Sequence, residues 1–340
     1  MLDPTLTSSY EYELPSSFIA DYPANPRRSA KMLVIDRQSG QITHSNVEKI
    51  NDFLPSSTKI IINNTKVIKA RIFGSKPSGG KIECVLIKPL EDNLFLVLLR
   101  GKVKIGDKVL FDERLSLEIK ELLEDGGRKV EFFEGEDRLD FAKLVEKLEQ
   151  IGHIPLPPYI ERADEKSDEI DYQTRFAKTA GSVAAPTASL HFDDELLEKL
   201  KTLHDFYELT LHVGLGTFKP VDAEIIDAHK IHSEYFEIPS STADILDSNA
   251  KILCIGTTAT RTVEFYHSTK QTGGECDIFI NPQNPPKRVD MLLTNFHLPK
   301  STLIMLVSAF LGLERTLEIY EIAKQNNYRF YSYGDCMLIL

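Results

Sequence analysis

The sequence predicts an α/β protein in which a mostly parallel sheet flanked by helices is interrupted by a small antiparallel β-barrel domain. Two observations predict this fold. Short apolar runs alternate with helical patterns before residue 66 and after residue 150, as in sheets covered by helices. Between these positions, closely spaced short strands are separated by turn residues, as in small barrels. We therefore expect residues 1–65 and 151–340 to form the α/β domain and residues 66–150 to form an inserted barrel.

The individual elements follow from apolar periodicity and turn residues. In the α/β part, buried strands are expected at residues 32–36, 59–63, 209–213, 252–256, 277–280 and 289–293. Helices are expected there at residues 193–203, 260–267, 301–312 and 314–324. In the insert, strands are expected at residues 67–73, 81–88, 94–99, 108–111 and 128–133, followed by a helix at 141–148. Gly152 stands just past the end of that helix, where a helix stop is favoured.

Composition excludes several classes of protein. Apolar residues make up 42% and charged residues 27% of the chain, which is typical of a globular protein and unlike a disordered or collagen-like one. No apolar run reaches the ~20 residues of a membrane span, and the N-terminus lacks the basic start and apolar stretch of a signal peptide. The four cysteines form no CxxC motif, so we expect reduced thiols in a cytoplasmic protein without membrane contact.

Charge is distributed unevenly along the chain. The net charge of −11 argues against indiscriminate nucleic-acid binding. Residues 66–110, however, contain ten basic and four acidic residues, so this stretch carries +6 and the rest of the chain −17. A nucleic-acid-binding face of the barrel and an ordinary solvated surface would both produce this pattern.

Two loops in the middle of the chain combine small residues with polar or aromatic ones. The loop at 181–192 contains Thr187, His191 and Phe192 among small residues that would let a ligand approach the backbone, although a tight strand-to-helix connection would look the same. The loop at 212–218 contains His212, Gly214, Gly216, Thr217 and Phe218. It ends a predicted strand, where ligands of α/β sheets bind, but it lacks the full glycine pattern of a dinucleotide site. A lone histidine there could equally belong to the core.

Two further loops join a predicted strand to a predicted helix. The loop at 256–262 offers Thr257, Thr258 and Arg261 at a helix N-terminus, where free N–H groups attract anions, and plain N-capping is the alternative. The loop at 293–302 crowds together Asn295, Phe296, His297, Lys300, Ser301 and Thr302, with Ser301 as the expected N-cap. It lacks the upstream glycines of a Walker motif, which excludes an ATPase.

A metal site is not expected. His229 and His232 have the spacing of two ligands on one helical face, but no cysteine cluster and no HExxH motif accompanies them.

Taken in order, these loops closely resemble the S-adenosylmethionine:tRNA ribosyltransferase-isomerase family of queuosine biosynthesis. The similar segments are INNTKVIKAR at 62–71, IPLPPYI at 154–160, YQT at 172–174, AAPTA at 184–188, LHF at 190–192, LHVG at 211–214, GTF at 216–218, HSE at 232–234, GTT at 256–258, RT at 261–262, LLTNFHLPKSTL at 292–303, YRF at 328–330 and SYGD at 332–335. They run from one end of the chain to the other, and their combination is specific although no single segment is.

The resemblance implies an enzyme that acts on a tRNA anticodon arm bearing 7-aminomethyl-7-deazaguanine at the wobble position. In that family S-adenosylmethionine donates its ribosyl group, adenine and methionine leave, and the sugar is rearranged to give epoxyqueuosine. The donor is a consumed co-substrate, so no cofactor is implied. The family fold, an α/β domain interrupted by a small barrel, agrees with the fold predicted from the residues.

Such chemistry requires a base for the C5′ proton beside the sulfonium, an acid to assist the departure of adenine, and donors for the methionine carboxylate. The acid–base candidates are His191, His212, His297 and Asp335, with no step assigned to any one of them. The candidates for an anion cradle are Thr257, Thr258 and Arg261, and those for stacking on adenine are Phe192, Phe218 and Phe296. The other substrate-binding candidates are Thr187, Gly214, Gly216, Thr217, Asn295, Lys300, Ser301 and Thr302. We expect the three histidines to converge on one pocket with Thr258 and Arg261.

The candidates for contact with tRNA phosphates are Arg27, Arg28, Lys66, Lys69, Arg71, Arg100, Lys102 and Lys104. If residues 100–104 continue a strand, the last three would form a row on one face. Two other functions would fit parts of the sequence. A methyltransferase is suggested by the GxG that follows Val213, and a non-catalytic tRNA-binding scaffold by the basic barrel alone. We expect a monomer, because no coiled-coil heptad is visible.

Overall fold

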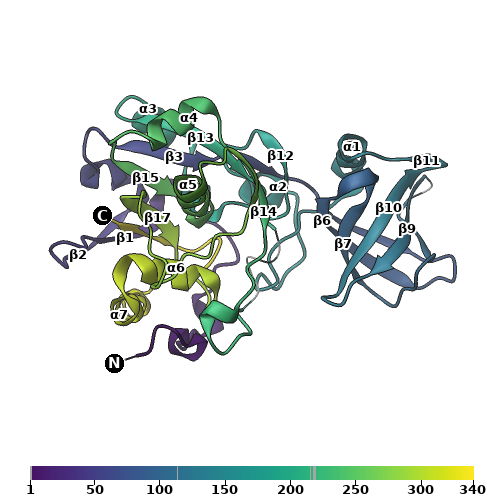
Figure 1. Ribbon diagram of the computed structural model, residues 1–340, viewed down its shortest axis with the longest axis horizontal. Helices are drawn as coiled ribbons and strands as arrows, with labels where there is room; N and C mark the ends of the chain where they lie inside the picture. Colours follow the sequence, from purple (N-terminus) through teal and green to yellow (C-terminus); the bar gives the residue numbers. More distant parts are fainter. Residues whose placement is uncertain (1, 113, 215, 217–219) are drawn as a thin grey trace.

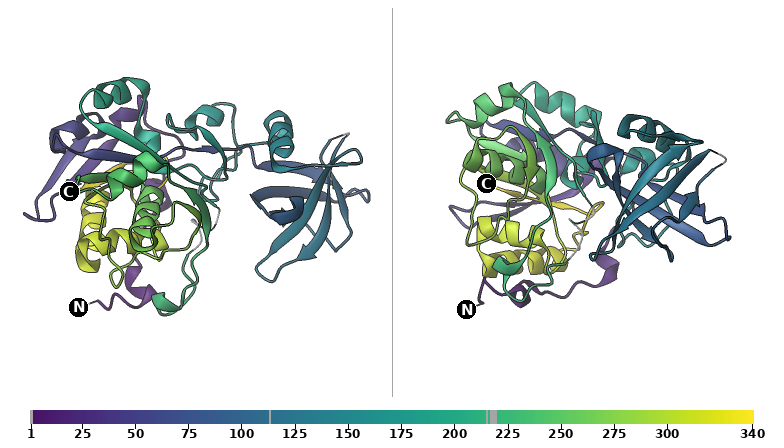
Figure 2. Two further views of the ribbon diagram at one scale, coloured as in Figure 1. Left: turned by 45° about the horizontal axis from the view of Figure 1, so that its top comes forward. Right: turned by 45° about the vertical axis from the view of Figure 1, so that its right-hand side comes forward.

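The structure places a β-barrel beside an α/β body (Figure 1). It is a computed structural model that describes residues 2–112, 114–214, 216 and 220–340. The barrel lies at one end of the long axis of the molecule, and both chain termini belong to the body. The two further views in Figure 2 show the same arrangement.

The body is built on a nine-stranded mixed sheet with the order β16-β14-β13-β3-β15-β17-β18-β1-β2 in the part of the chain that the structure describes. Its strands are β1 (Lys31–Ile35), β2 (Ile42–Asn46), β3 (Lys59–Asn63), β13 (Asp205–Leu211), β14 (Glu234–Glu237), β15 (Ile252–Ile255), β16 (Gly273–Cys276), β17 (Met291–Asn295) and β18 (Cys336–Ile339). The central strands β13, β3, β15 and β17 are parallel, whereas β18 runs antiparallel to β17 and the edge strands β16, β14 and β2 pair antiparallel. Strand β1 pairs parallel with β18, so parallel pairing is confirmed for the four central strands and for this pair, within a sheet that is mixed as a whole.

Both faces of this sheet are buried, because its inner strands are apolar throughout. In β3, Ile61 belongs to one hydrophobic core, and Ile60 and Ile62 belong to the other. The first core is completed by α4 (Ser240–Leu246), α5 (Thr257–Thr269), α6 (Thr302–Leu311) and α7 (Leu313–Gln325). The second core is completed by α3 (Asp194–Lys201) and a 3-10 helix at Val47–Phe53.

The barrel is a closed, antiparallel six-stranded sheet. Its strands are β5 (Arg71–Ser75), β6 (Lys81–Pro89), β7 (Phe95–Arg100), β8 (Lys108–Leu110), β9 (Leu115–Leu122) and β10 (Gly127–Glu134), with the short β11 (Asp137–Arg138) added to β10. Closure follows from β10, which pairs with both β7 and β9. Helix α1 (Phe141–Ile151) begins at the N-cap Asp140 and packs Leu144 and Leu148 into the barrel core. The predicted antiparallel barrel is confirmed.

The chain enters and leaves the barrel beside a two-stranded parallel ribbon of β4 (Thr65–Val67) and β12 (Thr179–Ser182). All barrel strands and most of α1 lie within residues 66–150, and the domain boundaries at these positions stay a prediction. On the return path, α2 (Asp168–Asp171) carries the buried Asp168, which accepts two hydrogen bonds of 2.7 Å from Arg162 and one of 3.0 Å from Tyr333. This charged segment is therefore attached to the body.

Several expected elements differ from the structure. The strand predicted at 277–280 is wrong, because the backbone there leaves the sheet after β16, and the carbonyl of Ile278 accepts a hydrogen bond from the Arg261 side chain. Strands β2, β9, β11, β12, β14, β16 and β18 were not expected. No helix in the described part of the chain is long and apolar enough to cross a membrane.

Candidate active site

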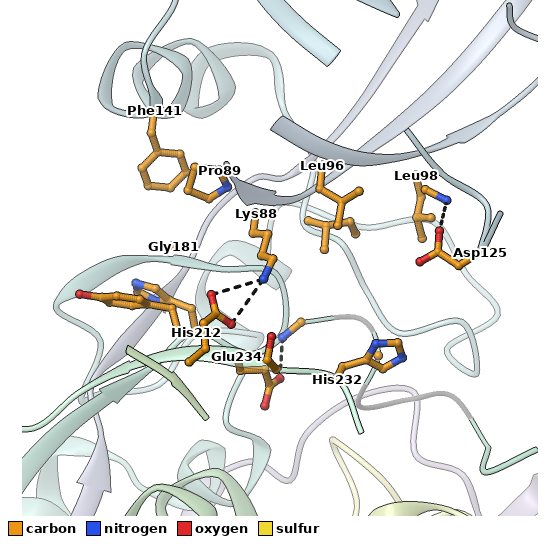
Figure 3. A pocket seen from close by; sticks show the side chains of 17 residues that line it. Lys88, Pro89, Leu96, Leu98, Asp125, Phe141, Gly181, His212, His232 and Glu234 are labelled. Atoms are coloured by element: carbon orange, nitrogen blue, oxygen red, sulfur yellow. Dashed lines mark hydrogen bonds and ion pairs between the residues drawn. The ribbon is translucent and has the colours of Figure 1, made fainter. Parts of the chain in front are cut away.

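A cavity of about 460 Å³ lies between the barrel and the body (Figure 3). Its volume falls in the range of ~300–1,000 Å³ that is usual for small-molecule sites. The barrel side is lined by Ile87, Lys88, Pro89, Leu96, Leu98, Asp125, Gly127 and Phe141. The body side is lined by Gly181, His212, Gly214, Gly216, His232, Ser233, Glu234, Tyr235 and Glu275. We call this cavity the cleft.

The barrel wall of the cleft is mainly apolar. Along β7, Phe95 and Val97 point into the barrel core, so the alternating Leu96 and Leu98 point outward into the cleft. A strand that is apolar on both faces indicates that its outer face is covered by a ligand or by another part of the protein. Phe141, the first residue of α1, extends this wall.

The body wall is polar and comes from strand ends at one edge of the sheet. His212 follows β13 directly, Glu234 and Tyr235 begin β14, and Glu275 lies in β16. Across the cleft, both carboxylate oxygens of Glu275 lie 3.4 Å from the Nζ of Lys88 on β6, so an ion pair joins the two walls. The cleft thus sets an acidic, histidine-bearing wall against an apolar one.

His212 is the predicted acid–base residue that reaches the cleft. Burial lowers the pKa of its imidazole below the ordinary value of 6.5, because the charged form loses hydration. The ring is therefore neutral at pH 7. A neutral imidazole facing a cavity has the protonation state that a general base requires.

Glu234 is held in the cleft wall by a backbone N–H and by a guanidinium. Its Oε1 accepts a hydrogen bond of 2.9 Å from the N–H of Gly214, and its Oε2 is paired with the guanidinium of Arg261. Arg261 also donates to the carbonyls of Ile278 and Cys276, at 3.3 and 3.4 Å. The assignment of Arg261 to an anion cradle is therefore not supported, because its guanidinium is already used by the protein.

A second group of predicted residues lies around two small hollows at the carboxyl ends of β15 and β17. One is lined by Thr187, Thr257, Thr258, Thr294 and His297 among others, and the other by Thr187, Asn295, Phe296, His297 and Ser301 among others. Each has a volume of about 30 Å³, close to the share of one water molecule in the liquid. Both are far smaller than the cleft.

His297 lines both hollows, and His191 is buried beside Asn295. The Nε2 of His297 lies 2.8 Å from the hydroxyl of Thr294, and the Nε2 of His191 lies 3.1 Å from the amide nitrogen of Asn295. Burial lowers the pKa of each histidine to about 3. The expected convergence of three histidines is therefore only partial: His297 and Thr258 share a hollow, whereas His212 lines the cleft.

The other predicted site residues in the described part of the chain have structural contacts. Phe192 and Phe296 are fully buried in the cores, which does not support stacking on adenine. Asp335 accepts hydrogen bonds from the backbone of Lys31 and Arg329 at 2.9 and 2.7 Å. Ser301 caps α6, Thr302 begins it, and the side chain of Lys300 is paired with Glu11. Thr217 and Phe218 lie outside the described residues.

Most of the cations proposed for tRNA contact are paired with acids. The pairs are Arg27 with Asp171, Arg28 with Asp193 and Glu195, Lys66 with Glu149, Lys69 with Glu169, and both Arg71 and, at 4.0 Å, Arg100 with Glu83. Arg27 is buried and donates to the carbonyls of Ile170 and Gln173, so its position does not support a phosphate contact.

Arg100, Lys102 and Lys104 are exposed, and the side chain of Arg100 is 88% accessible. Their predicted row along one strand is wrong. β7 ends at Arg100, and Gly101 has a φ of +133°, a backbone conformation that breaks the strand. The three cations therefore lie on a strand end and the following loop.

Sequence reasoning missed Glu234, His232, Tyr235 and the whole barrel wall. His232 was weighed only as a metal ligand, and the segment HSE at 232–234 was otherwise noted for its resemblance. The outward-facing Leu96 and Leu98 were the signal for a covered barrel face. In the part of the chain that the structure describes, no group of three or more metal-ligating side chains occurs.

Comparison with known proteins agrees with this architecture. The model of the queuosine biosynthesis protein family matches residues 7–339. The chain belongs to this family. A relative from Aliarcobacter butzleri, named S-adenosylmethionine:tRNA ribosyltransferase-isomerase, is 59% identical over 340 residues and is covered completely, as is this chain.

Other members of the family match over the same length. A protein of the same name from a Nitratiruptor species is 55% identical, with complete coverage of both chains. The crystal structure of S-adenosylmethionine tRNA ribosyltransferase from Thermotoga maritima is 32% identical, with 98% of this chain and 100% of that chain covered and a TM-score of 0.55. The family therefore spans the barrel as well as the body.

Proposed function

We propose that the protein transfers and isomerises the ribosyl group of S-adenosylmethionine onto 7-aminomethyl-7-deazaguanine at the wobble position of tRNA. The products would be epoxyqueuosine-tRNA, adenine and methionine. The observation that carries this proposal is the match over the whole chain to relatives named for a ribosyl transfer from S-adenosylmethionine to tRNA. The donor is consumed as a co-substrate, and we propose that no metal or other cofactor takes part.

The cleft is the proposed place where the two substrates meet. Its apolar wall, with Leu96, Leu98 and Phe141, suits the flat ring of a nucleobase. Its body wall places the neutral imidazole of His212 beside the carboxylates of Glu234 and Glu275, which are themselves paired with Arg261 and Lys88. An anticodon base must leave the stacked loop to enter such a cavity, as bases do in enzymes that modify them.

His212 is the proposed base for the C5′ proton of the donor. The adjacent sulfonium acidifies that carbon, and the lowered pKa of His212 keeps its ring neutral and able to accept the proton. His191 and His297 are proposed to hold the neighbouring residues Asn295 and Thr294 in place, without contacting the substrates.

The barrel and the exposed cations of residues 100–104 are proposed to hold the anticodon arm, with residues 66–150 as a domain of its own. Phosphate contacts of this kind would position the RNA without reading its sequence. A monomeric state and a cytoplasmic location stay predictions from the sequence.

The test is mass spectrometry after incubation of the protein with S-adenosylmethionine and a precursor-bearing anticodon arm. We expect the arm to gain the rearranged sugar and adenine and methionine to appear in equal amounts, whereas an arm with unmodified guanine should not react. S-adenosylhomocysteine would instead indicate a methyltransferase, and binding without turnover would indicate a scaffold. His212→Gln should lower turnover by about 10²–10⁴-fold, and His267→Gln, in the last turn of α5, should not.

A further inference from the structure

The segment Asn63-Asn64-Thr65 at the end of β3 makes contacts beyond the sheet ladder. The Oδ1 of Asn63 accepts a hydrogen bond of 3.1 Å from the backbone N–H of Leu211, and the Nδ2 of Asn63 donates one of 2.9 Å to the carbonyl of Leu211. Its Oδ1 also accepts the N–H of Thr65 at 3.1 Å. The Asn63 side chain therefore fixes the position of Thr65 relative to Leu211. Leu211 is the residue just before His212.

Asn64 extends this attachment between the two strand ends. Its Oδ1 accepts a hydrogen bond of 2.7 Å from the hydroxyl of Thr210, and its backbone N–H donates to the carbonyl of Leu209 at 2.9 Å. The ends of β3 and β13 are thus held together immediately before Thr65. A fixed backbone of this kind allows a side chain on one strand to place a side chain on the other.

The hydroxyl of Thr65 contacts the imidazole of His212 directly. Its Oγ1 lies 2.8 Å from Nδ1, and Thr65 itself is fully buried. No described residue forms a hydrogen bond with the Nε2 of His212. The bond to Thr65 therefore uses one ring nitrogen and leaves the other for a ligand.

The plane of the imidazole is set by two further neighbours that line the cleft. The ring of Tyr235 is stacked on it at a centroid distance of 5.9 Å and an interplanar angle of 20°. Gly181 has a φ of +152°, and a Cβ at that position would lie 2.7 Å from both Cε1 and Nε2 of His212. A side chain larger than hydrogen would push the ring from its place.

We propose that Thr65 is the positioning residue for His212: its hydroxyl oxygen accepts the Nδ1–H, so that the unprotonated Nε2 is presented to the cleft. The inference rests on the proposed role of His212 as base. When Nε2 takes the C5′ proton, the electron pair of the C–H bond stays on the carbon beside the sulfonium. The resulting imidazolium keeps its Nδ1–H on the same acceptor, so no reorientation is needed. A third group that orients a base in this way recurs in general acid–base sites.

The experiment compares Thr65→Val, which replaces the hydroxyl by a methyl group, with Thr65→Ser, which retains the hydroxyl and removes the methyl group. We expect Thr65→Val to lower kcat by about 10- to 100-fold, the loss typical of a misplaced catalytic group, while KM for S-adenosylmethionine and for the anticodon arm changes little. Thr65→Ser should recover most of the rate. Thr242→Val, in α4, is the matched control: the buried hydroxyl of Thr242 donates to the carbonyl of Glu208 at 2.7 Å, and the variant should keep the wild-type rate.

A second measurement does not depend on turnover. The imidazole ¹⁵N NMR signals of His212 in the wild-type protein should report the Nδ1–H form at neutral pH, and Thr65→Val should produce a mixture of both neutral forms. An Nε2–H form in the wild type would overturn the proposal, as would unchanged kcat in Thr65→Val or equal losses in the valine and serine variants. If the wild type makes no epoxyqueuosine-tRNA, the proposed function fails, whereas the NMR result still decides how Thr65 holds the ring.

Discussion

The pair of Arg261 and Glu234 offers a sharp test of how the cleft wall is held. We consider Arg261→Met, which keeps an unbranched side chain but removes the guanidinium and its charge. Both partners are buried, with side-chain exposures of 8% and 6%. The change removes the guanidinium from the Oε2 of Glu234 and from the carbonyls of Ile278 and Cys276.

The expected cost follows from these contacts. Removal of one partner of a buried ion pair typically destabilises a protein by about 3–5 kcal/mol, because the remaining charge stays desolvated after it has lost that partner. The two carbonyl contacts are long, at 3.3 and 3.4 Å, and add little. We therefore expect a loss of about 3–5 kcal/mol in the free energy of unfolding of the body. The double variant Glu234→Gln with Arg261→Met should lose less, since neither charge then remains.

Urea denaturation followed by far-UV circular dichroism measures this loss. The matched control is Lys178→Met, which breaks the exposed pair between Lys178 and Glu208 and should cost no more than about 1 kcal/mol. A cost for Arg261→Met as small as that of the control would refute the reasoning. So would a double variant that is less stable than Arg261→Met alone.

Three further predictions concern other parts of the molecule. Burial lowers the pKa of His191 and His297 to about 3, so below pH 6.5 the unfolded chain binds protons that the folded chain does not. The free energy of unfolding should therefore fall by about 2 kcal/mol per histidine between pH 7 and pH 5. Urea titrations that show no such fall would contradict this prediction. All four cysteines are free and buried, and burial raises the pKa of each thiol, so a thiol reagent should label them only as the protein unfolds; rapid labelling of the native protein would be inconsistent with the packing. The joint change of Arg100, Lys102 and Lys104 to Ala should weaken tRNA binding, with little effect on S-adenosylmethionine binding. The slope of log K against log salt should fall in magnitude by about 0.7–0.9 for each lost phosphate contact. An unchanged slope would show that these residues form an ordinary solvated surface.

The parts of the fold that could be predicted are those whose local pattern reflects their burial. Residues 59–63 form β3 as expected, because a strand covered on both faces is a continuous apolar run. Helix α6 begins after the predicted cap Ser301 and ends before Gly312. The missed β9 has a clear alternation of Leu115, Leu117 and Ile119 with polar residues, so the sequence contained its signal. The antiparallel placement of β18 depends on long-range pairing that no local pattern records.

The candidate site was predictable only in part for the same reason. The position of His212 at a strand end follows from the sequence of β13 and its neighbours. The opposite wall comes from β6 and β7, more than a hundred residues earlier in the chain, and is formed by the relative placement of barrel and body. Arg261 looked like a ligand for an anion because nothing local shows that Glu234 reaches it.

The central claim is that ribosyl transfer takes place in the cleft between the barrel and the body. A crystal structure with a non-reactive S-adenosylmethionine analogue and a precursor-bearing anticodon arm tests it most directly. We predict that the ribosyl C5′ lies within hydrogen-bond reach of the Nε2 of His212 and that the modified base lies against Leu96 and Leu98. A donor bound at the N-terminus of α5 beside Thr258 and His297, with the cleft empty of both substrates, would contradict the account.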